Sequence, residues 1–400
     1  MSLFALSADD ARRIADLHGT PSFVYRLDLA GERFRLLQKS LPARVRLAYA
    51  IKANPHPALV GRFAELGASF DAASIGELSL LERLQVPGSR ILFAGPGKSK
   101  QELECALRLG ARIEIDGLED AQRIDDFMMR SPRGTSYPVA AEVSLRVHPQ
   151  RGVSEGSRII GGAGPSAFGV DEENLSQFLN DVRTLARVNV KGLQVFAASN
   201  ERDALRLAAN HRVALSIARV LADEVGAELD LIDLGGGLGI PYSADETELD
   251  VAALGESLAE LLDANAWFRG ELLLEPGRWL AGPSGAYLTR VLRLKESRGT
   301  RFAILEGGIN HLLRPLLTGQ AFPACAPGLH GGELVYTLTG PLCTSLDRLG
   351  EVLLPQLKSG DLLMFGQTGA YGFTEAMGTF LSHPLPAELI MEAPSGELRV

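Results

Sequence analysis

The chain has 400 residues, of which 46% are hydrophobic and 22% are charged, and its formal net charge is −9. This length predicts two to three domains, and the composition excludes a disordered, collagen-like or coiled-coil chain. The negative charge disfavours partners that present a phosphate backbone or an anionic membrane surface, so we expect small-molecule partners.

The sequence contains no apolar run of the roughly 18 to 20 residues that a membrane helix needs. Its first residues, MSLFALSADDARR, lack the basic and long apolar regions of a signal peptide, so we expect a cytoplasmic protein. The three cysteines, Cys105, Cys325 and Cys343, form no CxxC pair. They predict neither a disulfide framework nor a structural zinc site, and we expect no metal.

The opening segment combines a helix-like stretch at residues 7–19 with an apolar run at 22–28, which either caps a barrel or adds a strand to a later domain. From about residue 45 to 285, short apolar runs alternate with longer amphipathic stretches, as is typical of βα units. Eight runs predict strands, at residues 45–52, 69–74, 90–95, 112–117, 141–147, 191–196, 229–235 and 271–276. Helical periodicity lies between them, at residues 57–67, 75–86, 100–110, 118–129 and 204–226.

Eight strands, each followed by a helix, match the size of a TIM barrel, although a doubly wound open sheet with as many strands is the alternative. After residue 287 the pattern changes to strands without long helices, at residues 287–297, 300–308, 332–344 and 360–372. We therefore predict an α/β chain with a (β/α)8 TIM barrel at residues 25–285. A mainly antiparallel β-barrel or sandwich domain follows at residues 286–400, and residues 1–24 pack on it.

In a barrel, catalytic residues gather at the C-terminal ends of the strands. The first strand ends in AYAIKANP, which places Lys52 in an apolar context where an ammonium group is costly to bury. A lysine whose charge is suppressed by burial can form the Schiff base that pyridoxal phosphate requires. A lysine that extends from a strand end into solvent is the structural alternative.

The last two barrel strands also end in segments suited to this cofactor. Strand seven runs into DLGGGLGIPY, where the backbone amides of Gly235, Gly236 and Gly237 can hold a phosphate, with a tight turn as the alternative. The spacing differs from GxGxxG, so no dinucleotide site is predicted. Strand eight ends in LLLEPGRW. There Glu275 can pair with a protonated pyridine nitrogen and Arg278 with a phosphate or carboxylate, unless the two form a local ion pair.

A series of motifs runs nearly end to end along the chain: YAIKAN, FDAASIGEL, FAGPGKS, LRVHP, AFGV, LGGG, EPGR, GPLCTSLD and GAYG. In this order they resemble the fold-type III pyridoxal-phosphate decarboxylases, which share an alanine-racemase-like barrel and include diaminopimelate and ornithine decarboxylases. The resemblance implies pyridoxal 5'-phosphate as the cofactor and a homodimer with shared active sites.

By this resemblance Lys52 binds the cofactor covalently. The implied cofactor site comprises Lys52, Asp71, Glu77, Arg146, Phe196, Ser199, Gly235, Gly236, Gly237, Glu275, Arg278 and Tyr371. Phe196 stands where the family usually has a histidine that stacks on the pyridine ring. Cys343 and Asp347 would reach the neighbouring subunit's site, where Cys343 would donate the proton to the product. The structural alternatives are a small buried cysteine and, for Tyr371, an aromatic that packs at a turn.

The implied substrate contacts are Arg278, His311, Arg314, Cys343, Thr344 and Asp347. Diaminopimelate decarboxylases carry an acid and a tyrosine where this chain has Thr344 and Thr318, and ornithine-type enzymes also place an acid after the cysteine. That acid holds the distal ammonium of a diamino acid, so a free diamino acid has lost a specificity contact here. Carboxylates on an acylated substrate would instead suit the two arginines.

The segments GPLCTSLDRLGE and GAYGFTEAMGTFLSHPLPAELIM most closely resemble decarboxylases of carboxylate-siderophore pathways such as staphyloferrin B, achromobactin and vibrioferrin. We therefore predict decarboxylation of an acylated, citryl-type diamino acid. The alternatives are a free diamino acid (diaminopimelate, ornithine or lysine) and a carrier-tethered aminoacyl group. A racemase is disfavoured because racemases of this fold place an arginine where Glu275 stands, and a non-catalytic homologue is disfavoured because Lys52, Glu275 and Cys343 are all present.

Overall fold

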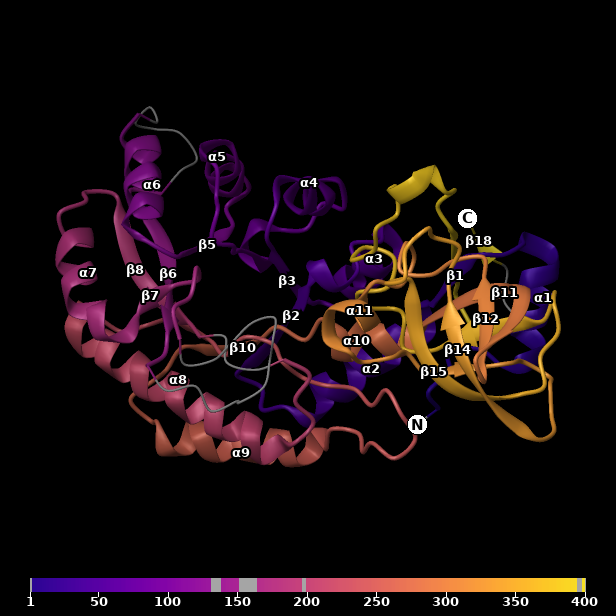
Figure 1. Ribbon diagram of the computed structural model, residues 1–400. Coiled ribbons are helices and arrows are strands. Elements are labelled where there is room, and N and C mark those ends of the chain that lie inside the picture. The colour runs from indigo at the N-terminus through magenta and orange to yellow at the C-terminus, as the bar shows by residue number, and fades with distance from the viewer. Residues whose placement is uncertain (1, 131–137, 151–163, 196–198, 394–397, 400) are drawn as a thin grey trace.

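A computed structural model describes residues 2–130, 138–150, 164–195, 199–393 and 398–399, and it contains two sheets (Figure 1). The first is a parallel barrel in the order β5-β4-β3-β2-β10-β9-β8-β6, closed by pairing of β5 with β6. Its strands are β2 (Val45–Ala50), β3 (Ser69–Ala72), β4 (Ile91–Phe93), β5 (Arg112–Ile115), β6 (Ala141–His148), β8 (Val188–Gln194), β9 (Leu231–Asp233) and β10 (Glu271–Leu274). This closure confirms the predicted TIM barrel over the open sheet.

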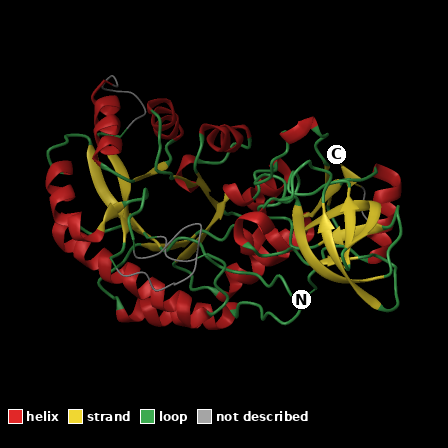
Figure 2. Cartoon of the chain, viewed as in Figure 1, coloured by secondary structure: helices red, strands yellow, loops and turns green. Residues whose placement is uncertain are grey.

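Helices surround the barrel strands, as the red ribbons of Figure 2 show. They are α2 (Leu27–Ser40), α3 (Pro57–Glu65), α4 (Ile75–Arg83), α5 (Lys100–Leu109), α6 (Leu118–Arg130), α7 (Leu175–Val182), α8 (Ala204–Val225) and α9 (Val251–Ala264). Side chains near the helix ends set these bounds. In α5, Ser99 and Glu102 form a capping box at the start, and Gly110 takes a left-handed conformation at the end.

The barrel interior contains a small apolar cluster formed by Ala48, Leu92, Leu231 and Leu273. These residues come from β2, β4, β9 and β10, so they join strands that are far apart in the sequence. Parallel strands covered by helices are buried on both faces. That burial explains why the strands read in the sequence as short continuous apolar runs.

The second sheet has the order β15-β14-β12-β11-β1-β17-β18, and β16 pairs with β11 and β13. Its strands are β1 (Ser22–Arg26), β11 (Gly285–Ser297), β12 (Thr300–Leu305), β13 (Ala324–Cys325), β14 (Glu333–Thr339), β15 (Arg348–Pro355), β16 (Leu362–Phe365), β17 (Ala387–Met391) and β18 (Leu398–Arg399). The pairs β1–β17 and β12–β14 are parallel, and the other pairs are antiparallel. The sheet is therefore mainly antiparallel, as predicted. We call this part of the chain the β domain.

The N-terminal segment joins the β domain. After α1 (Ala8–His18), the fully buried strand β1 lies between β11 and β17, so it adds a strand to the sheet. The boundaries at residues 25 and 285 stay predictions; they fall within β1 and at the first residue of β11. Among the described residues, no helix is long and apolar enough to cross a membrane.

We expect Leu273→Ala to lower the free energy of unfolding by about 2–5 kcal/mol, because it leaves a cavity inside the barrel. Leu273 is fully buried in β10, and urea denaturation measures the change. Leu292→Ala is the matched control, since Leu292 is 51% exposed on β11 and its loss should stay within about 0.5 kcal/mol. Equal losses in the two variants would contradict the packing argument.

Candidate active site

A cavity of about 460 Å³ lies where the C-terminal ends of the barrel strands meet the β domain. Nine of the residues implied by the sequence line it: Lys52, Glu77, Ser199, Gly236, Gly237, Glu275, Arg278, Arg314 and Tyr371. Arg314 and Tyr371 belong to the β domain, and the others follow barrel strands. The cavity therefore draws its walls from both parts of the chain.

Lys52 lies in a short 3-10 turn directly after β2, and its side chain is 42% exposed. Its Nζ donates a hydrogen bond of 2.8 Å to Oδ2 of Asp71, at the end of the neighbouring strand β3. Burial lowers the pKa of Lys52, but the charges of Asp71 and Glu275 outweigh that effect and raise the pKa overall. The prediction that burial suppresses the charge on Lys52 is therefore wrong: two carboxylates hold the amine protonated.

Glu77 is positioned by the start of α4. Ser74 caps this helix by accepting from the Glu77 backbone amide, and Oε2 of Glu77 accepts a 2.7 Å hydrogen bond from the Ala73 amide. Burial raises the pKa of Glu77 to about 7, although the hydrogen bond from Ala73 opposes it. Glu77 therefore changes its charge near neutral pH.

The glycine-rich loop after β9 needs the backbone freedom of glycine. Gly235 and Gly237 have φ values of 71° and 94°, a region that residues with a Cβ rarely adopt. The Gly235 amide donates to Oδ1 of Asp233 at 2.8 Å, and Gly235 does not line the cavity, whereas Gly236 and Gly237 do. Within the described chain, the loop thus presents two of its three predicted glycines to the cavity.

Arg278 begins the short helix α10 (Arg278–Ala281), and its Nη1 donates to the Tyr242 hydroxyl at 2.6 Å. Tyr371 lies close by, with its ring centroid 4.8 Å from the guanidinium carbon of Arg278 and 4.7 Å from that of Arg314. The Tyr371 amide donates to the Ala53 carbonyl at 2.9 Å, which ties the β domain to the turn that carries Lys52. The β domain therefore fixes the position of the cavity wall.

Arg146 was predicted to belong to the cofactor site and His311 to contact the substrate, but neither residue lines the cavity. Arg146 lies 4.0 Å from Asp116 and stacks on the Phe168 ring. His311 is buried, and its Nδ1 lies 2.8 Å from the Tyr287 hydroxyl. Burial lowers the pKa of His311 to about 4, so it is neutral at neutral pH and supplies no positive charge for a substrate carboxylate.

The loop after β14 holds Cys343, Thr344 and Asp347 outside this chain's own cavity. Cys343 is exposed, which excludes the alternative of a small buried cysteine. Asp347 is 3% exposed, and its two oxygens accept from the amides of Ile309 and Leu342 at 2.8 Å each. Both oxygens hold the loop backbone, so Asp347 shapes the loop. Its contact with a substrate in a neighbouring subunit's site stays a prediction. Phe196 falls outside the described residues.

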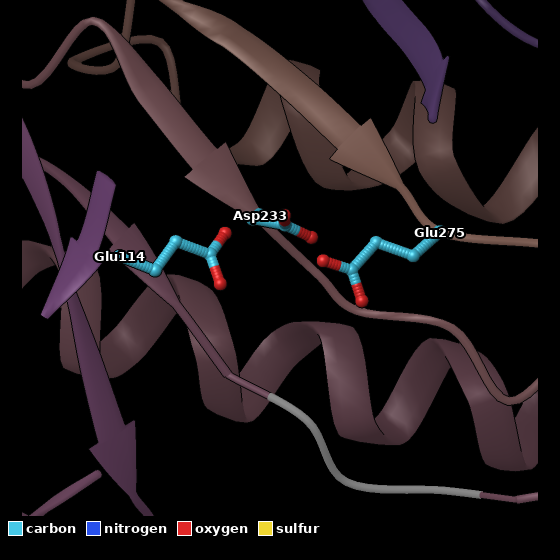
Figure 3. Close-up of side chains that lie close together, drawn as sticks. All are labelled: Glu114, Asp233 and Glu275. Carbon is cyan, nitrogen blue, oxygen red and sulfur yellow. The ribbon is translucent and has the colours of Figure 1, made fainter. Parts of the chain in front are cut away.

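The structure adds carboxyl groups that the sequence analysis missed. Glu375 lines the cavity, and its carboxylate accepts from Nη1 of Arg314 at 3.0 and 3.3 Å. Glu114 of β5 and Asp233 of β9 lie beside Glu275 inside the barrel (Figure 3). One signal was available in the sequence, because Glu114 is a charged residue between two isoleucines in a strand. No signal in the sequence indicated that Glu375 pairs with Arg314.

The donor set fits pyridoxal phosphate. The amine of Lys52 borders the cavity, and Glu275 lines it. Oε1 of Glu275 is buried without a partner among the described residues. The glycine loop and the guanidinium group of Arg278 lie on the same cavity and provide N–H donors of the kind that hold a phosphate.

Comparison with known proteins agrees with this site. Residues 27–282 match the family described as pyridoxal-dependent decarboxylase, pyridoxal binding domain. The diaminopimelate decarboxylase of Deinococcus radiodurans is 31% identical, covering 98% of this chain and 94% of that protein. The L-glutamyl-acyl-carrier-protein decarboxylase of Niallia circulans is 28% identical, covering 95% and 90%. The crystal structure of Helicobacter pylori diaminopimelate decarboxylase complexed with L-lysine has a TM-score of 0.87 at 25% identity, covering 97% and 95%.

The barrel and its cavity define a pyridoxal-phosphate enzyme that acts on amino acids. More particularly, the chain belongs to the pyridoxal-dependent decarboxylase family, with pyridoxal phosphate as its cofactor. The bound cofactor withdraws electrons from the bond that breaks at the α-carbon of the amino acid. The protein must supply the amine, the charges and the proton that this chemistry needs.

We expect Asp71→Asn to lower the pKa of Lys52, because the charge of Asp71 is the strongest of those that raise it. Only the neutral amine attacks the cofactor aldehyde, so covalent attachment at a given pH should become about tenfold faster. Stopped-flow absorbance after adding pyridoxal phosphate to the cofactor-free protein measures the rate. Glu142→Gln, which changes an exposed carboxylate on β6, should leave it unchanged. An unchanged or slower rate in Asp71→Asn would contradict the assignment.

Proposed function

We propose that this decarboxylase acts on an amino acid that carries a citryl-type acyl group at its distal end, as in carboxylate-siderophore biosynthesis. The observation that carries the proposal is the neutral Thr344 beside the exposed Cys343. A distal ammonium finds no acid at this point of the loop. Arg314, which lines the cavity, offers a cationic partner for an acyl carboxylate.

In this proposal the barrel residues and Tyr371 hold the cofactor, and Arg314 of the β domain holds the substrate's distal end. Lys52 supplies the amine that anchors the cofactor, with Asp71 as its counter-charge. Glu275 faces the ring nitrogen. The amides of Gly236 and Gly237 bind the phosphate together with Arg278, Ser199 and Tyr371.

One relative supports a substrate without a free distal ammonium. The Niallia circulans protein is described as acting on a glutamyl group attached to an acyl-carrier protein, and it matches this chain over nearly its whole length. A carrier-tethered glutamyl group and a citrylated diamino acid both lack a distal ammonium. Thr344 suits both, because neither brings a second ammonium group.

A second candidate substrate, a free diamino acid, is favoured by Glu375. This carboxylate lines the cavity and is 25% exposed beside Arg314. It is placed where it could receive a distal ammonium, as the diaminopimelate decarboxylase relatives would suggest. The two candidates make opposite demands on the pair: an acyl carboxylate must displace Glu375 from Arg314, whereas an ammonium must displace Arg314 from Glu375.

We expect the citrylated diamino acid to exceed free diaminopimelate or ornithine by at least about 100-fold in kcat/KM. A difference of about 2.7 kcal/mol is enough for this ratio, and an unpaired buried ammonium costs several kcal/mol. Steady-state assays of carbon dioxide release measure both substrates. Arg314→Ala should raise KM for the acylated compound and leave weak activity on free diamino acids nearly unchanged.

Glu375→Gln is the matched variant for this assay, because it releases Arg314 from its carboxylate partner without changing side-chain size. KM for the acylated compound should fall if an acyl carboxylate binds Arg314. Two results together would establish the second candidate and contradict the first. In the wild type, kcat/KM for a free diamino acid would equal or exceed that for the acylated compound, and Glu375→Gln would lose most of its activity on the free diamino acid.

We also propose that the active enzyme is a homodimer in which Cys343 serves the partner's cavity as proton donor. Cys343 is exposed and lies outside the cavity of its own chain. The loop that carries it is held in shape by the buried carboxylate of Asp347. A rigid loop that presents a thiol outward is suited to completing a neighbouring site.

Mixing Lys52→Ala with Cys343→Ala subunits should restore about a quarter of wild-type activity, because random exchange makes half the dimers hybrid and each hybrid has one intact site. Each variant alone should be nearly inactive. Activity of the coexpressed mixture measures this recovery, and hybrid dimers isolated by two affinity tags should have about half of wild-type activity. No recovery in purified hybrid dimers would contradict the shared site.

A further inference from the structure

Behind Glu275, the interior of the barrel holds two further carboxyl groups, Glu114 and Asp233 (Figure 3). Each of the three residues offers an oxygen within 4.8 Å of the other two. Glu114 and Asp233 are fully buried and Glu275 is 4% exposed. Glu275 lines the cavity, whereas the other two lie beneath it in the described chain. We call these three residues the carboxyl cluster.

When all its members are ionised, four oxygens of the carboxyl cluster have no hydrogen-bond donor among the described residues. Both oxygens of Glu114, Oδ2 of Asp233 and Oε1 of Glu275 are buried without a partner among the described residues. An ionised carboxylate can only accept, whereas a protonated carboxyl group can also donate. Three buried anions at this separation would also repel one another. Protonation of members of the cluster removes both costs, because each added proton becomes a donor to a neighbouring carboxylate.

The surrounding charges place the protons on Glu114 and Asp233. Burial, followed by the charges of Glu275 and Asp71, raises the pKa of Glu114 well above its usual range. The charge of Arg146 and the hydrogen bond that a protonated Asp233 would donate only partly oppose this. Burial and the charges of Glu275 and Glu114 raise the pKa of Asp233 in the same way. Glu275 is less affected. The charges of Lys52 and Arg146 and the hydrogen bond that a protonated Asp233 would donate oppose burial and the charge of Asp71, so the pKa of Glu275 rises only to about 7.

We propose that Glu114 is a positioning residue that acts together with Asp233: both stay protonated and donate hydrogen bonds along the cluster, which stabilise Glu275 as the carboxylate facing the protonated ring nitrogen. Asp233 is fixed for this task because its Oδ1 accepts from the Gly235 amide, which leaves Oδ2 for its carboxyl neighbours. Without these donors, a proton shared between the ring and Glu275 would move toward Glu275. This inference rests on the proposed placement of the cofactor ring against Glu275.

Infrared spectroscopy of the holoenzyme tests the protonation of Glu114. The carbonyl stretch of a buried, protonated carboxyl group should be present in the wild type and lost in Glu114→Gln. Glu142→Gln is the matched control, because Glu142 is exposed and the same substitution there should leave this band intact. If Glu114→Gln removes no such band, Glu114 is ionised, as it would be with a bound cation, and the proposal is overturned.

Nitrogen-15 NMR of the holoenzyme, prepared with pyridoxal phosphate labelled at the ring nitrogen, tests the effect on the cofactor. Glu114→Gln keeps a donor and should give the wild-type signal at neutral pH, whereas Glu114→Met removes it. In Glu114→Met the ratio of protonated to unprotonated ring nitrogen should fall about tenfold, as expected for loss of a hydrogen bond to a charged group. Equal change in both variants, or change in neither, would overturn the proposal.

Glu275→Gln separates this inference from the placement on which it rests. If the ring faces Glu275, Glu275→Gln should shift the labelled nitrogen toward its unprotonated signal more strongly than Glu114→Met does. A shift with Glu275→Gln and none with Glu114→Met overturns the role of Glu114 alone. No shift with Glu275→Gln overturns the placement of the cofactor and this inference with it, whereas the decarboxylase assignment is tested separately by carbon dioxide release.

Discussion

The site depends on one constraint: a lysine ammonium group and several carboxyl groups share a poorly solvated space at the mouth of a closed barrel. Asp71 and Glu275 outweigh the desolvation of Lys52 and keep it charged. Burial raises the pKa of Glu77 and Glu275 to about 7, and the charge of Asp71 adds to this effect. Charge balance at this point therefore decides which groups can hold, donate or accept a proton.

The two parts of the chain divide the work of the cavity. The barrel brings Lys52 and Glu275 to its mouth, whereas the β domain contributes Arg314, Glu375 and Tyr371. The contact from the Tyr371 amide to the Ala53 carbonyl joins the two halves beside Lys52. The β domain therefore shapes the cavity both beside Lys52, through Tyr371, and at the ion pair of Arg314 with Glu375.

Much of the fold was predictable because each barrel strand is buried on both faces and stands out as a short apolar run. The strands β15 and β17 of the β domain were missed. β15 alternates buried and exposed positions and includes Gly350 and Glu351, and β17 has only five residues. In the site, the positions of Lys52 and Glu275 followed from strand ends. Strand ends did not indicate the charge of Lys52, the neutrality of His311 or the role of Asp347 in its loop.

By itself, the sequence determined the order of strands and helices, the glycine loop and the residues that follow each barrel strand, because these depend on local pattern and spacing. Tertiary structure decided the protonation and pairing of those residues. Glu114, Asp233 and Glu275 come from three separate strands, and barrel closure brings them within 4.8 Å. Desolvation and Coulomb energies depend on burial and distance in space, so neither could be read from positions along the chain.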